Sequence, residues 1–480
     1  MMRSVLTGML LLMGCSQPAA TASTIPSDCA PAGLTDALQA LRSAASGDDG
    51  AYQLTRRLVL EVGTRPAGSA AEARAIDWAA TELAAAGLSD VRREPFPLRR
   101  WGELASTLQV EGAVPQSLRV IALGGAPSTP GPISVPVLRV ESLQALSDLP
   151  AVTVAGHAVF FDGRMQRTRD RSGYQAAVKA RRDGPALAAE KGARLFLLRS
   201  IGTDDSRQPH AGMTLFPADA PKIPALALSN ADADWLAARL AQGGVSVTAD
   251  SQTRYDTAQS ANVLATLPAG GERDGSGSVV LAAHLDSWHV GLGASDDASG
   301  VGTVISAARL LLPHAALLRR NLDVILYGAE EPAIVGGHAY VERHRGRLAH
   351  IAAVESDLGS GRLWRLQLPD PARVSRADLL LAAALEPLGI ALSLSRPAFG
   401  GADIQPLAAH GVRLYDIDPD ARHYFDIHHT EEDTLAHVSA DNLRQHVAAL
   451  ASFALVIGSV DLHCMQDAAP PIAAKPQARP

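Results

Sequence analysis

The second half of the chain alternates between short apolar runs and longer amphipathic segments. Four apolar runs of strand length predict buried β-strands: 279–283, 322–327, 350–354 and 412–417. Two longer segments with apolar residues three or four positions apart predict helices: 298–312 and 442–457. Strands without a polar face that alternate with helices are typical of a mainly parallel sheet with helices on both faces. The sequence therefore predicts an α/β domain that includes residues 251–464.

Two more stretches show patterns of their own. Residues 50–117 begin with helical spacing and continue with strand-like alternation at 91–101, and we assign them to the same α/β domain. Residues 118–250 carry short strands and helices, such as an apolar run at 157–161 and helical spacing at 231–242. They hold no cluster of catalytic residue types, so we expect a smaller inserted α/β domain.

The N-terminus combines a charged start with a short apolar run. Arg3 precedes residues 5–13, and the apolar run is too short for a mature membrane-spanning helix but typical of a signal peptide. The end of this run, Leu12-Met13-Gly14-Cys15, resembles the lipobox of bacterial lipoproteins. It predicts that residues 1–15 are an export signal with a lipidated Cys15, whereas a plain secretory signal is the alternative. Lipid chains would anchor the exported protein to a membrane, at the outer membrane and periplasm or at the cell surface.

Composition and cysteine content bear on the partners of the protein, on the two ends of the chain and on disulfide bonding. The net charge is -7 and no basic run is present, so we expect no nucleic-acid partner. Residues 16–49 are expected to form a tether and the start of the mature chain, and residues 465–480 a disordered tail. Apart from Cys15, the chain has Cys29 and Cys464, one near each end. In an oxidising compartment these two form either a disulfide or two separate thiols.

Histidine and carboxylate side chains gather where the predicted strands of the larger domain end. In chain order they are His284, Asp286, Asp296, Asp297, Glu330, Glu331, Asp357, His428 and His429. Open α/β sheets bind ligands at the carboxyl ends of their strands, so four strand ends are expected to deliver these groups to one rim. Imidazole and carboxylate ligands without thiolate suit zinc, with cobalt or manganese as substitutes.

Each of these groups, taken alone, also has an ordinary structural explanation. Asp296-Asp297 before a helix fits the chemistry of an N-cap, and Glu330-Glu331 fits a solvated helix start. A histidine such as His284 at a strand end fits a capped turn. Their order, and their common position at strand ends, favour a metal centre over these separate explanations.

The local sequence around these groups is similar to that of a known family. The segments that carry the likeness are 62–69, Trp101, 284–288, 293–300, 329–331, 355–357 and 428–434. They resemble the co-catalytic di-zinc peptidases, a family that includes leucyl aminopeptidases, glutamate carboxypeptidases and carboxypeptidase Q, and the pattern is nearest to carboxypeptidase Q. The likeness covers roughly residues 50–460. Residues 118–250 look like the protease-associated insertion of these enzymes, on a looser match.

The resemblance implies two Zn²⁺ ions per chain and a ligand set for each. His284 and Asp357 would hold one ion. Glu331 and His429 would hold the other, and Asp296 would bridge the two.

The resemblance also implies roles for the groups beside the ligands. Asp286 would accept the second ring N–H of His284 and fix its tautomer. Glu330 would be the general base that takes a proton from an activated water. Either His428 or His429 can be the ligand by residue type; in the family the ligand lies four residues before an Asp-Thr pair, which is His429 here. His428 would then hydrogen-bond the developing oxyanion.

The function implied by the resemblance is that of a di-zinc metallo-exopeptidase acting on dipeptides or short peptides with a free N-terminus, in a homodimer. A deacylase or amidase acting on amino-acid conjugates needs the same metal centre and stays open as an alternative. A glutaminyl cyclase-like enzyme would use fewer ligands, and a non-catalytic binding protein would have lost some, so the full set disfavours both. Asp403, which ends a Gly-rich loop, either meets the substrate's α-amine or is an exposed turn residue.

Overall fold

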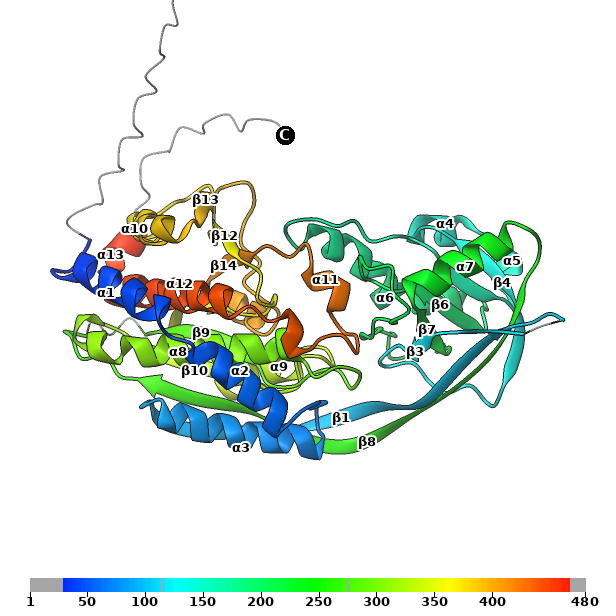
Figure 1. The fold of residues 1–480 in the computed structure, drawn as a ribbon, viewed down its shortest axis with the longest axis horizontal. Helices are drawn as coiled ribbons and strands as arrows, with labels where there is room; N and C mark the ends of the chain where they lie inside the picture. The colour runs from blue at the N-terminus through cyan, green and yellow to red at the C-terminus, as the bar shows by residue number, and fades with distance from the viewer. Residues whose placement is uncertain (1–28, 114, 274, 276, 467–480) are drawn as a thin grey trace, which may run out of the picture.

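The computed structural model describes residues 29–113, 115–273, 275 and 277–466, and Figure 1 shows a larger body and a smaller lobe. The expected signal peptide with Cys15 lies outside the described residues. Two strands of 22 residues each, β1 (Ser89–Val110) and β8 (Ser246–Leu267), join the body to the lobe. They pair antiparallel along most of their length. The alternation predicted at 91–101 is therefore only the first part of a longer strand.

The body is built on a mainly parallel sheet, which confirms the prediction. Its strands lie in the spatial order β13 (Ala391–Ser393), β12 (Leu363–Gln367), β14 (Arg413–Pro419), β11 (His350–Glu355), β9 (Ser278–His284), β10 (Asn321–Tyr327) and β8. The four central strands β14, β11, β9 and β10 run parallel to one another, whereas β12 is antiparallel to β14 and β8 is antiparallel to β10. The carboxyl ends of the four central strands therefore share one rim of the sheet.

Helices cover both faces of this sheet. One face packs against α1 (Leu34–Ser46), α2 (Gly50–Glu61), α3 (Ala70–Ala85), α8 (Ser299–Leu311), α10 (Arg376–Leu385) and α12 (Ala440–Ser459), and the other against α9 (Val335–Arg343). Strand β9 explains why its sequence has no polar face: Val279 and Leu281 pack on the first side, and Val280 and Ala282 on the second. The helical stretch Ala294–Leu317 is apolar and long enough to cross a membrane by composition, but α8 within it packs in the first core.

The lobe has a smaller parallel sheet that continues the sheet of the body. Its elements are β2 (Gln116–Leu118), β3 (Val120–Ala122), β4 (Ile133–Val140), α4 (Leu143–Asp148), α5 (Ala151–Val154), β5 (Ala158–Phe161), α6 (Ser172–Glu190), β6 (Leu195–Arg199), β7 (Ala225–Leu228) and α7 (Asn230–Leu240). Strands β4, β5, β6 and β7 are parallel, and β4 also pairs with β8. The expected insertion at 118–250 thus shares a sheet with the body through β8, because β8 is long enough to serve both parts.

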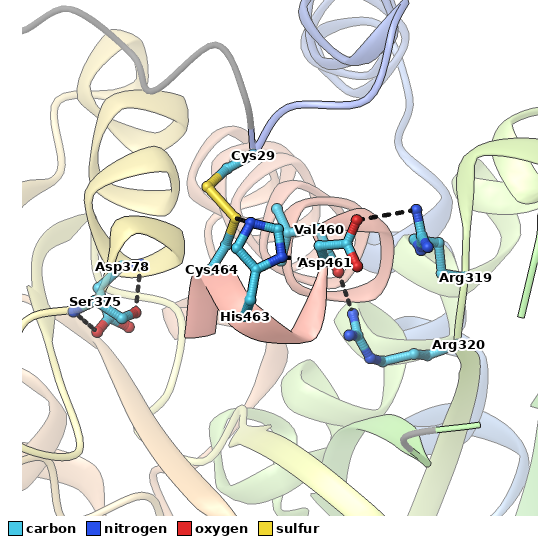
Figure 2. Close-up of a disulfide and its surroundings, with 9 residues drawn as sticks. All are labelled: Cys29, Arg319, Arg320, Ser375, Asp378, Val460, Asp461, His463 and Cys464. Carbon is cyan, nitrogen blue, oxygen red and sulfur yellow. Dashed lines mark hydrogen bonds and ion pairs between the residues drawn. A yellow bond between two sulfur atoms is a disulfide. The ribbon is translucent and has the colours of Figure 1, made fainter. Parts of the chain in front are cut away.

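The two ends of the described chain are tied together beside α12. Cys29 and Cys464 form a disulfide with a Cα–Cα distance of 5.9 Å, which links residues 435 positions apart (Figure 2). Cys464 lies in α13 (Leu462–Gln466), so the first two residues of the tail expected at 465–480 are helical. Nearby, Arg319 pairs with Asp461 at 3.3 Å. Of the two alternatives that the sequence left open for these cysteines, the structure has the disulfide.

Candidate metal centre

Five predicted ligands converge on the rim where the parallel strands of the body end. His284 is the last residue of β9, and Asp357 lies just beyond β11. Glu331 follows β10 after a short loop, and Asp296 sits in the helical turn η1 (Ala294–Ala298) that leads into α8. His429 differs from the prediction, because the helix α11 (Tyr424–Ile427) separates it from the end of β14.

The five side chains form two groups that share Asp296. In the first group, Nε2 of His284 lies 3.0 Å from Oδ1 of Asp296 and 3.5 Å from Oδ1 of Asp357. In the second, Nε2 of His429 lies 3.2 Å from Oδ2 of Asp296 and 3.2 Å from Oε2 of Glu331. The two oxygens of one carboxylate thus face the two groups separately, which is the arrangement that a bridging ligand needs.

These distances and the unpaired atoms of the rim fit zinc. Two ligand atoms on a tetrahedral ion with bonds of about 2.0–2.1 Å lie about 3.3 Å apart, close to the spacings between these side chains. Oδ2 of Asp296 and Oε1 of Glu331 are buried and have no hydrogen-bond partner among the described residues. Buried carboxylate oxygens without partners are costly, and a divalent cation would satisfy them.

His429 is better placed than His428 to be a ligand. The Nδ1 of His429 donates to the carbonyl of Ala211 at 3.1 Å, which leaves the lone pair of Nε2 facing the carboxylates. His428 stacks on His429 with ring centroids 3.5 Å apart, and its Nε2 lies 3.5 Å from Oδ2 of Asp296. Burial lowers the pKa of His428 well below its usual value, and the neighbouring His429 lowers it further. The geometry therefore favours His429 at the metal and a neutral His428 beside it.

Asp286 lies between His284 and the loop after β10. Its Oδ1 lies 3.6 Å from Nδ1 of His284, which has no hydrogen-bond partner among the described residues. Its two oxygens also accept the backbone N–H groups of Glu330 at 2.9 Å and Glu331 at 3.2 Å. The role of Asp286 in fixing the tautomer of His284 stays a prediction, and the structure adds a contact that the sequence did not indicate. Asp286 fixes the backbone that presents the predicted base and one predicted ligand.

Burial and mutual repulsion dominate the electrostatics of the rim. Burial raises the pKa of Glu330 well above its usual range, and the adjacent Glu331 raises it further. Burial also raises the pKa of Asp357. For His429, burial by itself would lower the pKa, but Glu331 and Asp296 raise it to about 9. Without other positive charge, some of these side chains bind protons to reduce the repulsion between the carboxylates. Bound cations would displace those protons.

Sequence reasoning missed two groups that support the rim. Asp433 accepts the backbone N–H groups of Ser295 at 2.7 Å and Asp296 at 3.1 Å, and burial raises its pKa to about 7. Arg65 is fully buried and donates to carbonyls of the loop after β9, among them that of Leu285 at 2.5 Å. Asp433 stood out in the sequence only as part of the Asp-Thr pair that locates His429, and Arg65 only as part of a similar segment, because neither residue ends a strand.

Asp403 is not the exposed turn residue that the sequence allowed. Its side chain is completely buried, and both carboxylate oxygens lack a hydrogen-bond partner among the described residues. Its backbone N–H donates to Oε2 of Glu355 at 3.1 Å, and burial raises the pKa of Glu355 to about 8. The small hollow over the shared carboxylate is lined by Trp288, Gly291, Gly293, Asp296, Glu331, His429, Thr430 and Asp433. Asp403 does not line this hollow, and its contact with the substrate's α-amine stays a prediction.

Comparison with known proteins points to one family. Residues 262–454 match the sequence profile of Peptidase family M28. Carboxypeptidase Q of Bos taurus is 29% identical over 419 residues, which are 85% of this chain and 85% of that protein. The crystal structure of a Peptidase M28 precursor from Shewanella amazonensis is 34% identical, with a TM-score of 0.85 over 92% of this chain and 99% of that one. A zinc aminopeptidase from Bacillus subtilis, 20% identical with a TM-score of 0.62 over 86% of this chain and 95% of that one, has a similar fold.

Proposed function

We propose that this chain, which belongs to peptidase family M28 and is a zinc metallo-exopeptidase, hydrolyses dipeptides or short peptides with a free N-terminus. The observation that carries the proposal is the pair of ligand groups that share Asp296. We assign one zinc ion to His284 and Asp357 and the other to Glu331 and His429. The preference for a free N-terminus is what the resemblance of the metal-site segments to the co-catalytic di-zinc peptidases implies, and the similarity to carboxypeptidase Q extends over 85% of the chain.

Glu330 supplies the proton transfers of the proposed reaction. Zinc ions held by these ligands would polarise the scissile carbonyl and lower the pKa of a water molecule. A carboxylate oxygen of Glu330 takes the proton of that water and then passes it to the leaving amine. Glu331 is committed to metal binding, and the hydrogen bonds from both backbone N–H groups to Asp286 hold the two glutamates in fixed positions.

His428 is the proposed donor to the developing oxyanion. Because burial keeps its pKa low, the ring carries a single proton. Its Nδ1 is buried without a hydrogen-bond partner among the described residues, whereas its Nε2 faces Asp296. A proton on Nε2 therefore points at the rim, where it can donate to charge that forms on the substrate oxygen.

Metal analysis and a substrate panel test the proposal together. Purified protein should contain about two zinc ions per chain, because two ligand groups are present, and a chelator should remove the activity reversibly. Reconstituted enzyme should cleave dipeptides and leave N-blocked dipeptides intact. Preference for N-blocked conjugates would establish the deacylase alternative instead. Full activity with a single bound ion would favour a cyclase-like centre.

Export and anchoring through Cys15 remain part of the proposal. The lipobox-like segment predicts that acyl chains on Cys15 alone hold the mature protein to a membrane. Cys15→Ser should move the protein from the membrane fraction to the soluble fraction after cell lysis. Identical partitioning of the variant and the wild type would contradict the anchor and leave the catalytic proposal untouched.

A further inference from the structure

The loop of the lobe between β6 and β7 lies against the segment that carries His428 and His429. Figure 1 places α6 of the lobe beside α11 of the body, and hydrogen bonds join the two parts at this junction. The backbone N–H of Thr203 donates to the carbonyl of Phe425 at 3.1 Å, and the hydroxyl of Thr203 donates to Asp426 at 2.7 Å. The contact therefore begins at α11 and continues along the chain towards the metal rim.

His429 and Ala211 hold each other through two hydrogen bonds. The backbone N–H of Ala211 donates to the carbonyl of His429 at 2.9 Å, and Nδ1 of His429 donates back to the carbonyl of Ala211 at 3.1 Å. Nη1 of Arg181, a buried residue of α6, donates to the same carbonyl at 3.1 Å. His429 has a φ of 62°, a left-handed conformation that residues with a side chain seldom adopt without support. The lobe supplies that support.

The preceding residue is held by a histidine of the same loop. Nδ1 of His210 donates to the carbonyl of His428 at 2.7 Å, and Nε2 of His210 lies 2.7 Å from Oδ1 of Asp204. His210 is 1% exposed, and its own backbone N–H donates to the hydroxyl of Ser200 at 2.8 Å. The imidazole is thus held at both ring nitrogens and the backbone at its N–H, with Nδ1 aimed at the segment that carries the ligand.

We propose that His210 and Arg181 of the lobe are positioning residues for the metal ion assigned to His429 and Glu331. They act through the backbone of His428 and the carbonyl of Ala211, which set the tautomer and the direction of the His429 ring. The other ion, assigned to His284 and Asp357, has no ligand on this segment. The lobe residues His210 and Arg181 therefore support the half of the metal centre to which His429 belongs. This inference rests on the proposed function.

The test measures how tightly each of the two ions is held. Cobalt is titrated into metal-free protein, and its absorption spectrum is recorded for the wild type and for His210→Leu, His210→Asn and Arg181→Met. Release of each ion to a chelator is then timed. His157→Leu is the control, because His157 is also in the lobe and, among the described residues, its ring hydrogen-bonds only to the nearby carbonyl of Ala155, at 3.1 Å. Thermal unfolding shows whether each variant is folded.

The expected result is selective weakening of one ion. His210→Leu and Arg181→Met should each bind one cobalt ion as the wild type does and release the second about 10–100-fold faster, the range for partners that orient a ligand. His210→Asn should restore much of the affinity, because its amide nitrogen can take the place of Nδ1. His157→Leu should match the wild type.

Two outcomes would overturn the inference, and a third would contradict the proposed function as well. If folded His210→Leu and Arg181→Met hold both ions as tightly as the wild type, the lobe does not position the ligand. If both ions weaken equally and in step with a lower unfolding temperature, the contact is only structural. A wild type that binds fewer than two ions would instead contradict the proposed function itself, and the inference would fall with it.

Discussion

The body and the lobe have similar architecture but treat buried charge at their strand ends in different ways. In the lobe, Arg199 ends β6, is 1% exposed and donates through Nε to Oδ1 of Asp162 at 2.6 Å. Asp162 directly follows β5, and its other oxygen accepts from Arg139 at 2.6 Å. Nη1 of Arg199 also donates to the carbonyl of Asn230 at 3.1 Å. Each charge at this rim therefore has a partner on the protein.

The rim of the body lacks such compensation. Its carboxylates lie against one another and against two histidines, and Oδ2 of Asp296 and Oε1 of Glu331 have no hydrogen-bond partner among the described residues. The fully buried Arg65 lies close enough to act on the charges of Asp286 and Asp296, but its side chain donates to backbone carbonyls. Buried charges at a strand-end rim therefore indicate a cation site when some of them lack a partner on the protein. They indicate a structural site when each of them has such a partner.

The largest effect is expected for Glu330→Gln, which tests whether the rim of the body is a catalytic metal centre. The amide keeps the size of the side chain but cannot accept a proton, so kcat should fall about 10²–10⁴-fold while the metal content stays unchanged. Turnover of one dipeptide and bound metal should be measured on the same sample. Loss of metal with proportionate residual activity would mean that the roles of Glu330 and Glu331 are exchanged. Normal turnover with metal bound would remove the proposed mechanism.

Asp296→Asn should loosen both ions at once. The substitution removes the charge that faces both ligand groups. A group that only orients a ligand is worth about 10–100-fold in metal affinity, and the loss of affinity for each ion should exceed that range. Equilibrium dialysis against a chelator measures the effect. Asp162→Asn at the rim of the lobe is the matched control and should keep both ions. A selective loss of one ion from Asp296→Asn would show that this carboxylate does not bridge.

Asp162→Asn should instead lower the stability of the protein. It removes one of two charge partners of the buried Arg199, whose Nη1 still lies 2.8 Å from Oδ1 of Asp234. The unfolding free energy should therefore fall by less than the about 3–5 kcal/mol that is typical when a buried charge loses its only partner. Urea unfolding followed by circular dichroism provides the measurement. The double variant Asp162→Leu with Arg199→Met should recover much of the loss, because an apolar pair needs no compensation. An unchanged unfolding midpoint in Asp162→Asn would show that the pair in the lobe is not a structural counterpart of the metal rim.

His446 in α12 is a buried histidine of the body that is not a predicted metal ligand, and it should make the stability of the protein depend on pH. Burial lowers the pKa of His446 to about 4, although its Nε2 lies 2.6 Å from the carbonyl of Gly361. The unfolded chain therefore takes up the proton first, and stability is complete above about pH 6.5 and falls as the pH drops towards 4, by about 3 kcal/mol in all. Urea unfolding of the wild type and of His446→Gln at pH 7 and pH 4.5 should show a smaller acid loss for the variant. Equal losses would place the acid sensitivity elsewhere.

The ligand residues could be found from the sequence because their positions follow from local patterns. Apolar runs located the strand ends, and parallel strands place those ends on one rim, so His284, Glu331 and Asp357 were expected to meet. The pattern of strand ends indicated His428 and His429 together, and the resemblance chose His429; α11 in fact separates the pair from the end of β14. Asp286 was recognised as part of the site, but its hydrogen bonds to the backbone of Glu330 and Glu331 were not expected, because sequence spacing does not say which way a carboxylate turns.

The sequence by itself determined the α/β class, the buried strands of the body and the set of histidines and carboxylates that meet at the rim. Only the tertiary structure decided that the lobe shares the sheet through β8, that Cys29 bonds to Cys464, and that Ala211 meets His429. The physical reason is that periodicity records whether a residue is buried within its own helix or strand. It does not record which distant segment covers that residue, and Ala211 and His429 are 218 positions apart in loops that have no period.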